Sequence, residues 1–252
     1  MFEYPLTLIR SSLLSQFPNI EFAMSTRQGE APDAPFGFNL GYELGDADER
    51  VTGNIARFAE ALGLDAGDLA VMKQVHGDTI RDVAEPGLYD ASDALVCTQP
   101  RVGITVRVAD CAPVILYAPD VQAVAVAHAG WRGTAEHITA KLLAHLIEQK
   151  HADPAGIFAY IGPCAGKEHY EVGPEVAALF PATYVDSSGD RPRIDLKGLN
   201  AQQLEHAGIP SANIEIDELC TIRDRALFHS WRRDGERSGR MLATIYLKDS
   251  IE

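Results

Sequence analysis

The sequence lacks long apolar runs, internal repeats and a dense set of cysteines. No apolar stretch approaches the roughly 20 residues of a membrane-spanning helix. The first ten residues contain Glu3 and Pro5 where a secretory leader would carry an apolar segment. The four cysteines are Cys97, Cys111, Cys164 and Cys220. They are too widely spaced for the disulfide framework of a small secreted domain. We therefore expect a cytoplasmic protein with reduced thiols and no membrane contact.

Positive charge is also scarce. The chain has 36 acidic residues against 22 lysines and arginines, which gives a formal net charge of −14. Such a balance repels a polyphosphate backbone, so we expect no nucleic-acid polymer as a partner. A small anion is still compatible with this charge, because a few local arginines can hold one.

The length allows a large buried core without disulfides. With 252 residues, of which 46% are apolar, the chain suits one large domain or two tightly joined halves. We see no linker or low-complexity segment that would mark a boundary. We therefore predict one domain that spans residues 1–252.

Short strands and helices alternate along the chain. Residues 103–108, 113–118 and 123–128 are rich in Val and Ile and predict three buried strands. A helix is predicted from Thr134, as its N-cap, to about Lys150. Further strands are predicted at 157–161, 214–219 and 241–247, and further helices at 174–179 and 196–206. This mixture predicts an α/β (α+β) fold, with one mixed sheet or two sheets covered by helices.

Three segments place a side chain that can bind a metal at the end of a predicted element. His76 follows an apolar stretch, Cys111 lies in the tight break between two strands, and His128 ends a strand just before a helix. Catalytic zinc sites commonly use three protein ligands and leave a fourth position open. Each residue also has a plainer interpretation, as a hydrogen-bonded histidine or a buried free cysteine. We predict a zinc site, and the catalytic centre, at these three residues, with copper as the other possible metal.

An anion subsite is predicted directly after His128. A helix N-terminus offers unpaired N–H groups and the positive end of a dipole. Gly130 and Gly133 allow a ligand to approach the backbone closely. Arg132 adds a forked guanidinium, and we predict that it binds the anionic part of a substrate.

Arg27, Asn39 and Lys73 are further candidates for substrate binding. Arg27 and Asn39 could hold a substrate through a bidentate contact and an amide, or they could belong to the structure of a turn-rich loop. Lys73 could contact phosphate or could be an exposed strand residue. Arg232 and Arg233 precede an Asp-Gly turn signal and are interpreted as solvated charges of a hairpin.

Together these segments resemble one family over nearly the whole chain. It is the family of laccase-domain proteins, first named multicopper polyphenol oxidoreductases and later described as purine nucleoside phosphorylases. The most specific matches are Lys-Gln-Val-His-Gly at 73–77 and His-Ala-Gly-Trp-Arg-Gly at 128–133. Further blocks are Ser-Thr-Arg at 25–27, Phe-Asn-Leu-Gly at 38–41, Ala-Asp-Cys at 109–111, Tyr-Glu-Val-Gly at 170–173 and Arg-Arg-Asp at 232–234. The chain departs from the pattern at Glu43, where many members carry His.

The resemblance implies a layered α/β/β/α fold and an activity. Two sheets would lie between helical layers, and zinc would be bound by His76, Cys111 and His128. The substrates would be purine nucleosides and phosphate, with phosphorolysis of adenosine, guanosine, inosine and methylthioadenosine. Hydrolytic deamination of adenosine would be a further activity.

Three other functions stay open from the residues alone. A copper-dependent polyphenol oxidase would use Cys and His donors, although a four-copper site needs clustered histidines and the eight here are scattered. A cysteine hydrolase, such as an amidase acting on cell-wall precursors, would use Cys111 as nucleophile and His128 as its base. A metal-dependent binding module would show no turnover. The sequence indicates no particular oligomeric state.

Overall fold

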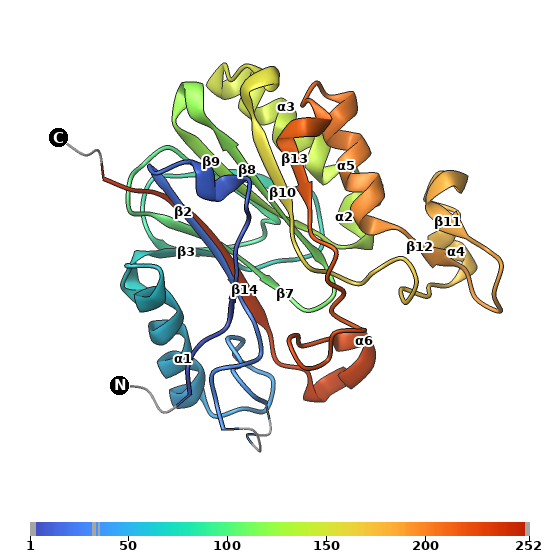
Figure 1. The fold of residues 1–252 in the computed structure, drawn as a ribbon, viewed down its shortest axis with the longest axis horizontal. Coiled ribbons are helices and arrows are strands. Elements are labelled where there is room, and N and C mark those ends of the chain that lie inside the picture. The colour runs from blue at the N-terminus through green and yellow to red at the C-terminus, as the bar shows by residue number, and fades with distance from the viewer. Residues whose placement is uncertain (1–3, 32–33, 35, 250–252) are drawn as a thin grey trace.

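The structure is a computed structural model that describes residues 4–31, 34 and 36–249 (Figure 1). Glu3, part of the expectation about the N-terminus, lies outside these residues. The helices in the described part of the chain are α1 (Asp48–Ala61), α2 (Trp131–Ala135), α3 (Ile138–Lys150), α4 (Pro174–Ala177), α5 (Leu196–His206) and α6 (Trp231–Asp234). None of them is long and apolar enough to cross a membrane.

Two six-stranded sheets form the centre of the molecule. Sheet A has the order β1 (Leu8–Ile9), β2 (Ile20–Ser25), β14 (Met241–Leu247), β7 (Gly103–Val108), β3 (Leu69–Met72) and β5 (Gly87–Tyr89). Sheet B has the order β13 (Ile214–Ile216), β10 (Phe158–Ile161), β8 (Ala112–Ala118), β9 (Ala123–Ala129), β6 (Ala94–Cys97) and β4 (Ile80–Val83). Both sheets mix parallel and antiparallel pairs. A small separate ribbon pairs β11 (Val185–Asp186) with β12 (Arg193–Ile194).

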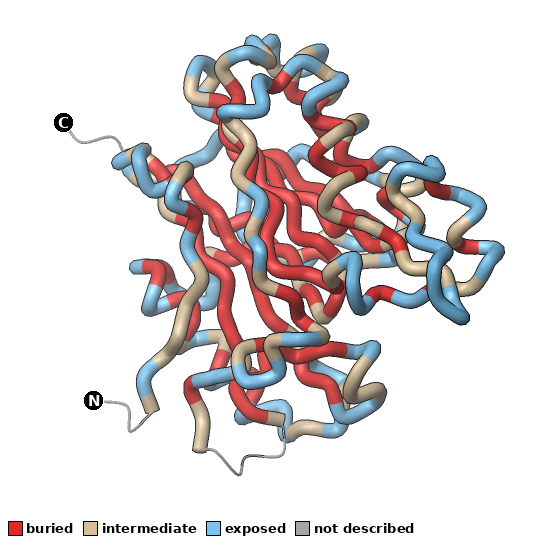
Figure 2. Tube along the Cα trace, turned by 45° about the vertical axis from the view of Figure 1, so that its right-hand side comes forward, coloured by how far each residue is buried: buried red, intermediate tan, exposed pale blue. Residues whose placement is uncertain are grey.

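The two sheets pack face to face and share one apolar interior. Ile104 and Ile245 from sheet A lie in the same buried cluster as Ile115 and Val126 from sheet B. Figure 2 shows the strands of both sheets as the most continuously buried part of the chain. Every residue of β8, β9 and β14 is buried, as expected for strands that are covered on both faces.

Helices cover the outer faces of both sheets. Phe58 of α1 packs with Leu242 on the outer face of sheet A. α3 and α5 lie on the other side of the molecule and cover sheet B, with Leu142 and Leu199 in one buried cluster (Figure 1). The predicted α/β/β/α layering is therefore confirmed.

The alternation of residues in β9 explains how this strand serves two layers. Its four alanines belong to the cluster that α3 and α5 cover, and small side chains let a helix pack closely. Val124 and Val126 point the other way, into the interior between the sheets. By the same period of two, His128 follows the valines to the face turned toward sheet A.

The strands at 103–108 and 241–247 and the helix at 196–206 are confirmed with the same bounds. The strands at 113–118 and 123–128 are confirmed, each with one additional residue. The strand at 157–161 starts one residue later than predicted. The extended segment at 214–219 is regular only over Ile214–Ile216, and the helix at 174–179 ends at Ala177.

The helix predicted from Thr134 was wrong at its start. The helical backbone begins three residues earlier, at Trp131, with Gly130 as the N-cap. Thr134 is fully buried inside α2, where its hydroxyl accepts a hydrogen bond from Asn200. His137 then adopts a left-handed conformation, with φ of 62°, and separates α2 from α3. A left-handed residue cannot continue an α-helix, so the helix restarts at Ile138.

The hairpin expected around the Asp-Gly pair at 234–235 was also wrong. Ser230 caps the short helix α6, because its side chain accepts a hydrogen bond from the Arg233 backbone N–H at 3.2 Å. The Arg233 guanidinium pairs with Asp234, while Arg232 lies at the cavity described below. The local capping signal therefore outweighs the turn signal.

Candidate active site

Cys111 and His128 meet because β8 and β9 pair in a fixed antiparallel register. Cys111 directly precedes β8, at the point where the chain crosses from sheet A to sheet B, and His128 is the penultimate residue of β9. The register pairs Ala112 with Ala129 and Pro113 with His128. The thiol of Cys111 consequently lies within hydrogen-bonding reach of His128, and also of His76.

A fully buried carboxylate, Asp93, holds both histidines. It lies just before β6, the strand beside β9, and its oxygens accept hydrogen bonds from the backbone N–H groups of Val75, His76 and Gly77 at 2.8–3.1 Å. One oxygen also lies 2.8 Å from Nδ1 of His128. Asp93 thus fixes the loop that carries His76, whose φ is 61°, and leaves Nε2 of His128 for the side of Cys111.

The three side chains form a donor set that fits a metal ion. The ligand atoms of His76, Cys111 and His128 lie within 4.8 Å of one another. The imidazole rings of the two histidines are 4.8 Å apart at an interplanar angle of 71°, so they do not stack flat. Imidazole and thiolate are groups that zinc and copper bind in proteins. The second ring nitrogen of a metal-binding histidine commonly pairs with a carboxylate, and Nδ1 of His128 lies 2.8 Å from Asp93.

The electrostatics of the group favour a thiolate. Burial disfavours ionisation of Cys111, but the charge of His128 and hydrogen bonds from both histidines outweigh it and lower the thiol pKa to about 6. Burial also opposes the charge on His128, but the Cys111 thiolate and the Asp93 carboxylate raise its pKa to about 9. A preformed thiolate can bind a metal or act as a nucleophile.

Gly130 makes room for this arrangement. A Cβ atom at this position would lie 2.9 Å from Sγ of Cys111 and 3.5 Å from the ring of His76. The glycine therefore allows the start of α2 to approach the donor set closely.

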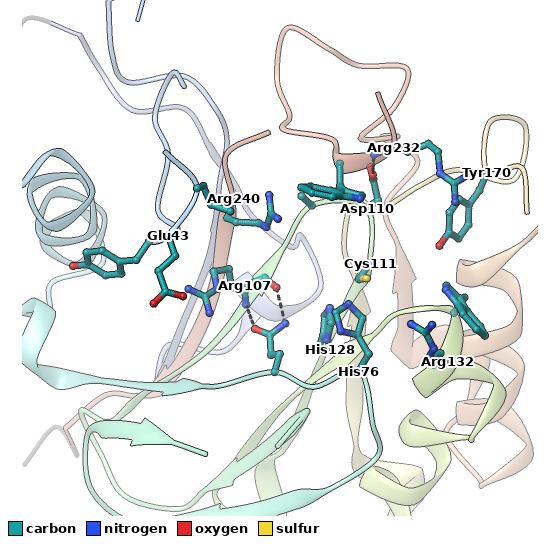
Figure 3. A pocket seen from close by; sticks show the side chains of 16 residues that line it. Glu43, His76, Arg107, Asp110, Cys111, His128, Arg132, Tyr170, Arg232 and Arg240 are labelled. Atoms are coloured by element: carbon teal, nitrogen blue, oxygen red, sulfur yellow. Dashed lines mark hydrogen bonds between the residues drawn. The ribbon is translucent and has the colours of Figure 1, made fainter. Parts of the chain in front are cut away.

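A cavity of about 630 Å³ opens over the three side chains (Figure 3). Its lining includes four aromatic residues, which are Tyr42, Trp131, Tyr170 and Trp231. Both tryptophans of the chain are among them, and Trp231 is 48% exposed. This volume lies within the ~300–1,000 Å³ of typical small-molecule sites, and flat aromatic faces suit a planar ligand.

The cavity is a positive region on an acidic protein. Four arginines line it, against two carboxylates, Glu43 and Asp110. Asp110 is already engaged, since its oxygens accept hydrogen bonds from the Thr221 hydroxyl and from the Arg232 backbone N–H. A concave surface with excess positive charge attracts small anions.

Of the four residues predicted to bind substrate, the structure places one in the cavity and three outside its lining. Arg132 lines the cavity, where its guanidinium is 4.2 Å from the centroid of the Trp131 ring. Arg27, Asn39 and Lys73 do not line it. Arg27 donates to the Arg225 carbonyl at 3.3 Å, and the exposed Lys73 pairs with Asp90.

Asn39 instead supports a residue that does line the cavity. It is fully buried, and its side-chain oxygen accepts hydrogen bonds from the backbone N–H groups of Gly41 and Arg240, each at 2.9 Å. The amide nitrogen donates to the Gly41 carbonyl. Asn39 therefore ties the loop after it to the start of β14.

Sequence reasoning missed Asp93, Arg107 and Gln74. Asp93 had no distinguishing pattern around it. Arg107 was detectable as the single charged residue in the apolar strand 103–108. Gln74 lies within the Lys-Gln-Val-His-Gly block, and its side chain forms two hydrogen bonds with the backbone of Arg107, at 2.7 and 2.8 Å.

The layered fold and the His/Cys/His cavity define a class of α/β proteins with a candidate metal centre between two sheets. A family model described as multi-copper polyphenol oxidoreductase laccase matches residues 21–248. The chain therefore belongs to this family.

Individual relatives match over nearly their whole length. A purine nucleoside phosphorylase of Deinococcus radiodurans is 36% identical over 241 residues, which cover 93% of this chain and 92% of the relative. The purine nucleoside phosphorylase YlmD of Geobacillus stearothermophilus is 33% identical, with 88% of each chain covered.

Solved structures show the same fold. The Bacillus licheniformis hypothetical protein YfiH has a TM-score of 0.89 and 32% identity, with 96% of each chain covered. YlmD from Geobacillus stearothermophilus has a TM-score of 0.88 and 29% identity, with 97% of this chain and 100% of that chain covered.

Proposed function

We propose that this protein is a zinc-dependent purine nucleoside phosphorylase. The observation that carries the proposal is the position of the His/Cys/His donor set. The three side chains line a cavity whose other walls include aromatic and arginine side chains. A purine nucleoside has a flat base for the aromatic faces, and phosphate is an anion for the guanidinium groups. The names of the relatives agree with this chemistry.

His76, Cys111 and His128 would hold the metal, and we propose zinc because catalytic zinc sites commonly use three protein ligands and leave a fourth position open. When bound, the ion supplies a Lewis acid and lowers the pKa of a coordinated water. Asp93 orients His128 and the loop of His76, so it acts on the centre without touching the substrate.

Phosphorolysis needs two substrates held in line. A phosphate oxygen forms a bond to C1′ of the ribose while the C1′–N9 bond breaks. The purine leaves with the bonding electrons and takes up one proton, and the other product is ribose 1-phosphate. The protein contributes position and charge, because the arginines offset the negative charge of phosphate as it approaches the sugar.

We propose hydrolytic deamination of adenosine as a second activity of the same site. Water adds at C6 of the base and ammonia leaves, so the products are inosine and ammonia. A carboxylate usually carries the proton in such reactions, and Glu43 and Asp110 are the carboxylates that line this cavity. The Asp110 oxygens are already hydrogen-bonded, so we propose Glu43 for this role.

A cysteine hydrolase is the second candidate, and one observation favours it. Cys111, His128 and Asp93 form a nucleophile, base and orienting carboxylate in the order that a catalytic triad requires. A four-copper oxidase is less favoured. Among the described residues, the group of His76, Cys111 and His128 is the single set of three or more donors close enough to share an ion.

Product analysis with adenosine tests the proposal. The protein is incubated with adenosine in the presence and absence of inorganic phosphate, and the products are separated by chromatography. We expect adenine and ribose 1-phosphate with phosphate, and inosine in either condition. Neither base release nor deamination, together with a metal-free protein whose Cys111 is readily alkylated, would support the cysteine hydrolase instead.

A further inference from the structure

Two arginines from neighbouring strands meet at one end of the cavity. Arg107 belongs to β7, and Arg240 directly precedes β14, its antiparallel neighbour. Figure 3 shows both guanidinium groups on one side of the His/Cys/His group, with Arg132 on the other side. The cavity therefore offers two separate places where an anion can bind.

The backbones of these two arginines are held rigidly. Gln74 forms paired hydrogen bonds with the backbone N–H and carbonyl of Arg107. Asn39 accepts from the backbone N–H of Arg240, and one guanidinium nitrogen of Arg240 donates to the carbonyls of Ser238 and Gly239 at 2.8 and 3.0 Å. Since Gln74 is two residues before His76, the same loop positions the arginine and the donor set.

No ion pair neutralises either charge of the pair within the described residues, and the Arg107 guanidinium has no hydrogen-bond partner among them. Burial lowers the pKa of both arginines, and Glu43 partly opposes this at Arg107. Arg107 lowers the pKa of Arg240 further, which Asp110 and Cys111 oppose only in part. Two adjacent, partly buried positive charges are unfavourable unless an anion joins them.

Arg132 differs from the pair in its exposure, because Arg132 is exposed whereas Arg107 and Arg240 are half-buried. Its guanidinium lies 4.2 Å from the centroid of the Trp131 ring, and that of Arg240 lies 5.3 Å from the centroid of the Trp231 ring. An exposed guanidinium is already solvated by water, so it gains less from an anion than a desolvated one does.

We propose that Arg107 and Arg240 together hold the phosphate that attacks the nucleoside. The proposal rests on the phosphorolysis proposed above. Two forked guanidinium groups from fixed backbones can bind the oxygens of one phosphate from two directions. Glu43, which faces Arg107 in the same cavity, opposes the anion and weakens its binding.

The test compares four glutamine variants that each lose one positive charge. Arg107→Gln and Arg240→Gln remove the proposed subsite, Arg132→Gln removes an arginine on the other side of the cavity, and Arg237→Gln is a matched control outside the cavity lining. The KM for inorganic phosphate and the KM for inosine are measured for each. We expect the phosphate KM to rise about 10- to 100-fold in the first two variants and much less in the others. The inosine KM should change far less than the phosphate KM.

Two further variants protect the test from effects on folding. Arg107→Lys keeps the charge without the fork and should give an intermediate phosphate KM. Glu43→Gln should lower the phosphate KM, a change in the direction opposite to a damaged fold. Circular dichroism checks that each variant is folded.

The failure of this subsite can be distinguished from failure of the proposed function. Phosphorolysis with an unchanged phosphate KM in Arg107→Gln and Arg240→Gln, or a rise only in Arg132→Gln, overturns the subsite and leaves the activity standing. If the wild type releases no base from any nucleoside, the proposed function fails. Titration of the protein with inorganic phosphate, followed by tryptophan fluorescence, then decides the subsite: binding lost in both variants supports it, and binding retained overturns it.

Discussion

Asp93 links the two histidines of the candidate centre through one carboxylate. Its oxygens bind three backbone N–H groups of the loop at 75–77 and Nδ1 of His128. Burial raises the pKa of this carboxyl, but the hydrogen bonds from His128 and Gly77 outweigh it, so the pKa is lowered overall. The carboxylate therefore stays charged and keeps both donors in place.

Replacing Asp93 with Asn tests this positioning role. The change keeps the size of the side chain but removes one acceptor, so Nδ1 of His128 or the loop of His76 loses its partner. We expect the affinity for zinc to fall about 10- to 100-fold, measured by competition with a chelator. Asp82→Asn, which removes an exposed carboxylate paired with Lys150, serves as the control. Unchanged zinc affinity in Asp93→Asn would contradict the role.

Cys111 should be the reactive thiol of the metal-free protein. Its pKa is lowered to about 6, whereas burial raises the pKa of Cys97 and raises that of Cys164 to about 12. The reactive thiolate is present above the pKa, so alkylation of Cys111 should be near its full rate at pH 7 and fall below pH 6. Peptide mapping after brief iodoacetamide treatment identifies the modified residue. Zinc should protect it, and faster labelling of Cys164 would contradict the assignment.

At the scale of elements, helices α2, α3 and α5 are joined by one buried amide. The Asn200 side chain in α5 donates to the Thr134 hydroxyl and to the Leu196 carbonyl, and it accepts from the Thr139 hydroxyl at 2.6 Å. All these polar atoms lie in a region closed to water. The amide therefore fixes α2, the element that carries Arg132, against the rest of the helical layer.

Asn200→Ala should destabilise the protein because it leaves buried partners without hydrogen bonds. The expected loss is about 1–3 kcal/mol in the free energy of unfolding, measured by urea titration. Asn213→Ala, which removes an exposed amide, should change it by less than about 0.5 kcal/mol. Equal effects of the two substitutions would show that the buried network contributes no special stability.

The sequence predicts the helices, the strands and the candidate metal-binding side chains better than it predicts the residues that orient those side chains. The sequence singled out His76, Cys111 and His128 because each lies at the end of a patterned segment within a specific motif, and the structure brings the three side chains together. Asp93 reaches His128 through the pairing of β6 with β9 and also binds the loop at 75–77, and local sequence encodes neither contact. The break at His137 was not predictable either, since a left-handed His carries no strong signal.

The end of the cavity that carries Arg107 and Arg240 could not be predicted from local sequence either. Arg107 and Arg240 are far apart in sequence and meet because β7 and β14 are neighbours in sheet A. The sequence predicted a direct substrate contact for Asn39. The structure places Asn39 outside the cavity lining, where its side-chain oxygen accepts a hydrogen bond from the backbone N–H of Arg240. Local patterns give the residue types of a site, whereas the partners that orient them come from strand order.

For the whole molecule, we propose that residues 1–252 form one cooperative domain. The interior between the sheets is a single cluster to which both sheets contribute, so neither sheet can bury its inner face alone. Calorimetry should therefore show one unfolding transition, with equal calorimetric and van't Hoff enthalpies. Two separate transitions would contradict the proposal and indicate two tightly joined halves.

The central claim is that the His76, Cys111 and His128 set binds zinc and that phosphorolysis depends on it. The most direct measurement is the rate of hypoxanthine release from inosine and phosphate, before and after removal of metal by a chelator, with zinc counted by elemental analysis. We predict about one zinc per chain in the purified protein, loss of base release on removal, and recovery when one equivalent of zinc is restored. His76→Ala, Cys111→Ser and His128→Ala should each lose both the metal and the activity. Full base release from a protein without zinc, or from His76→Ala with normal metal content, would contradict the account.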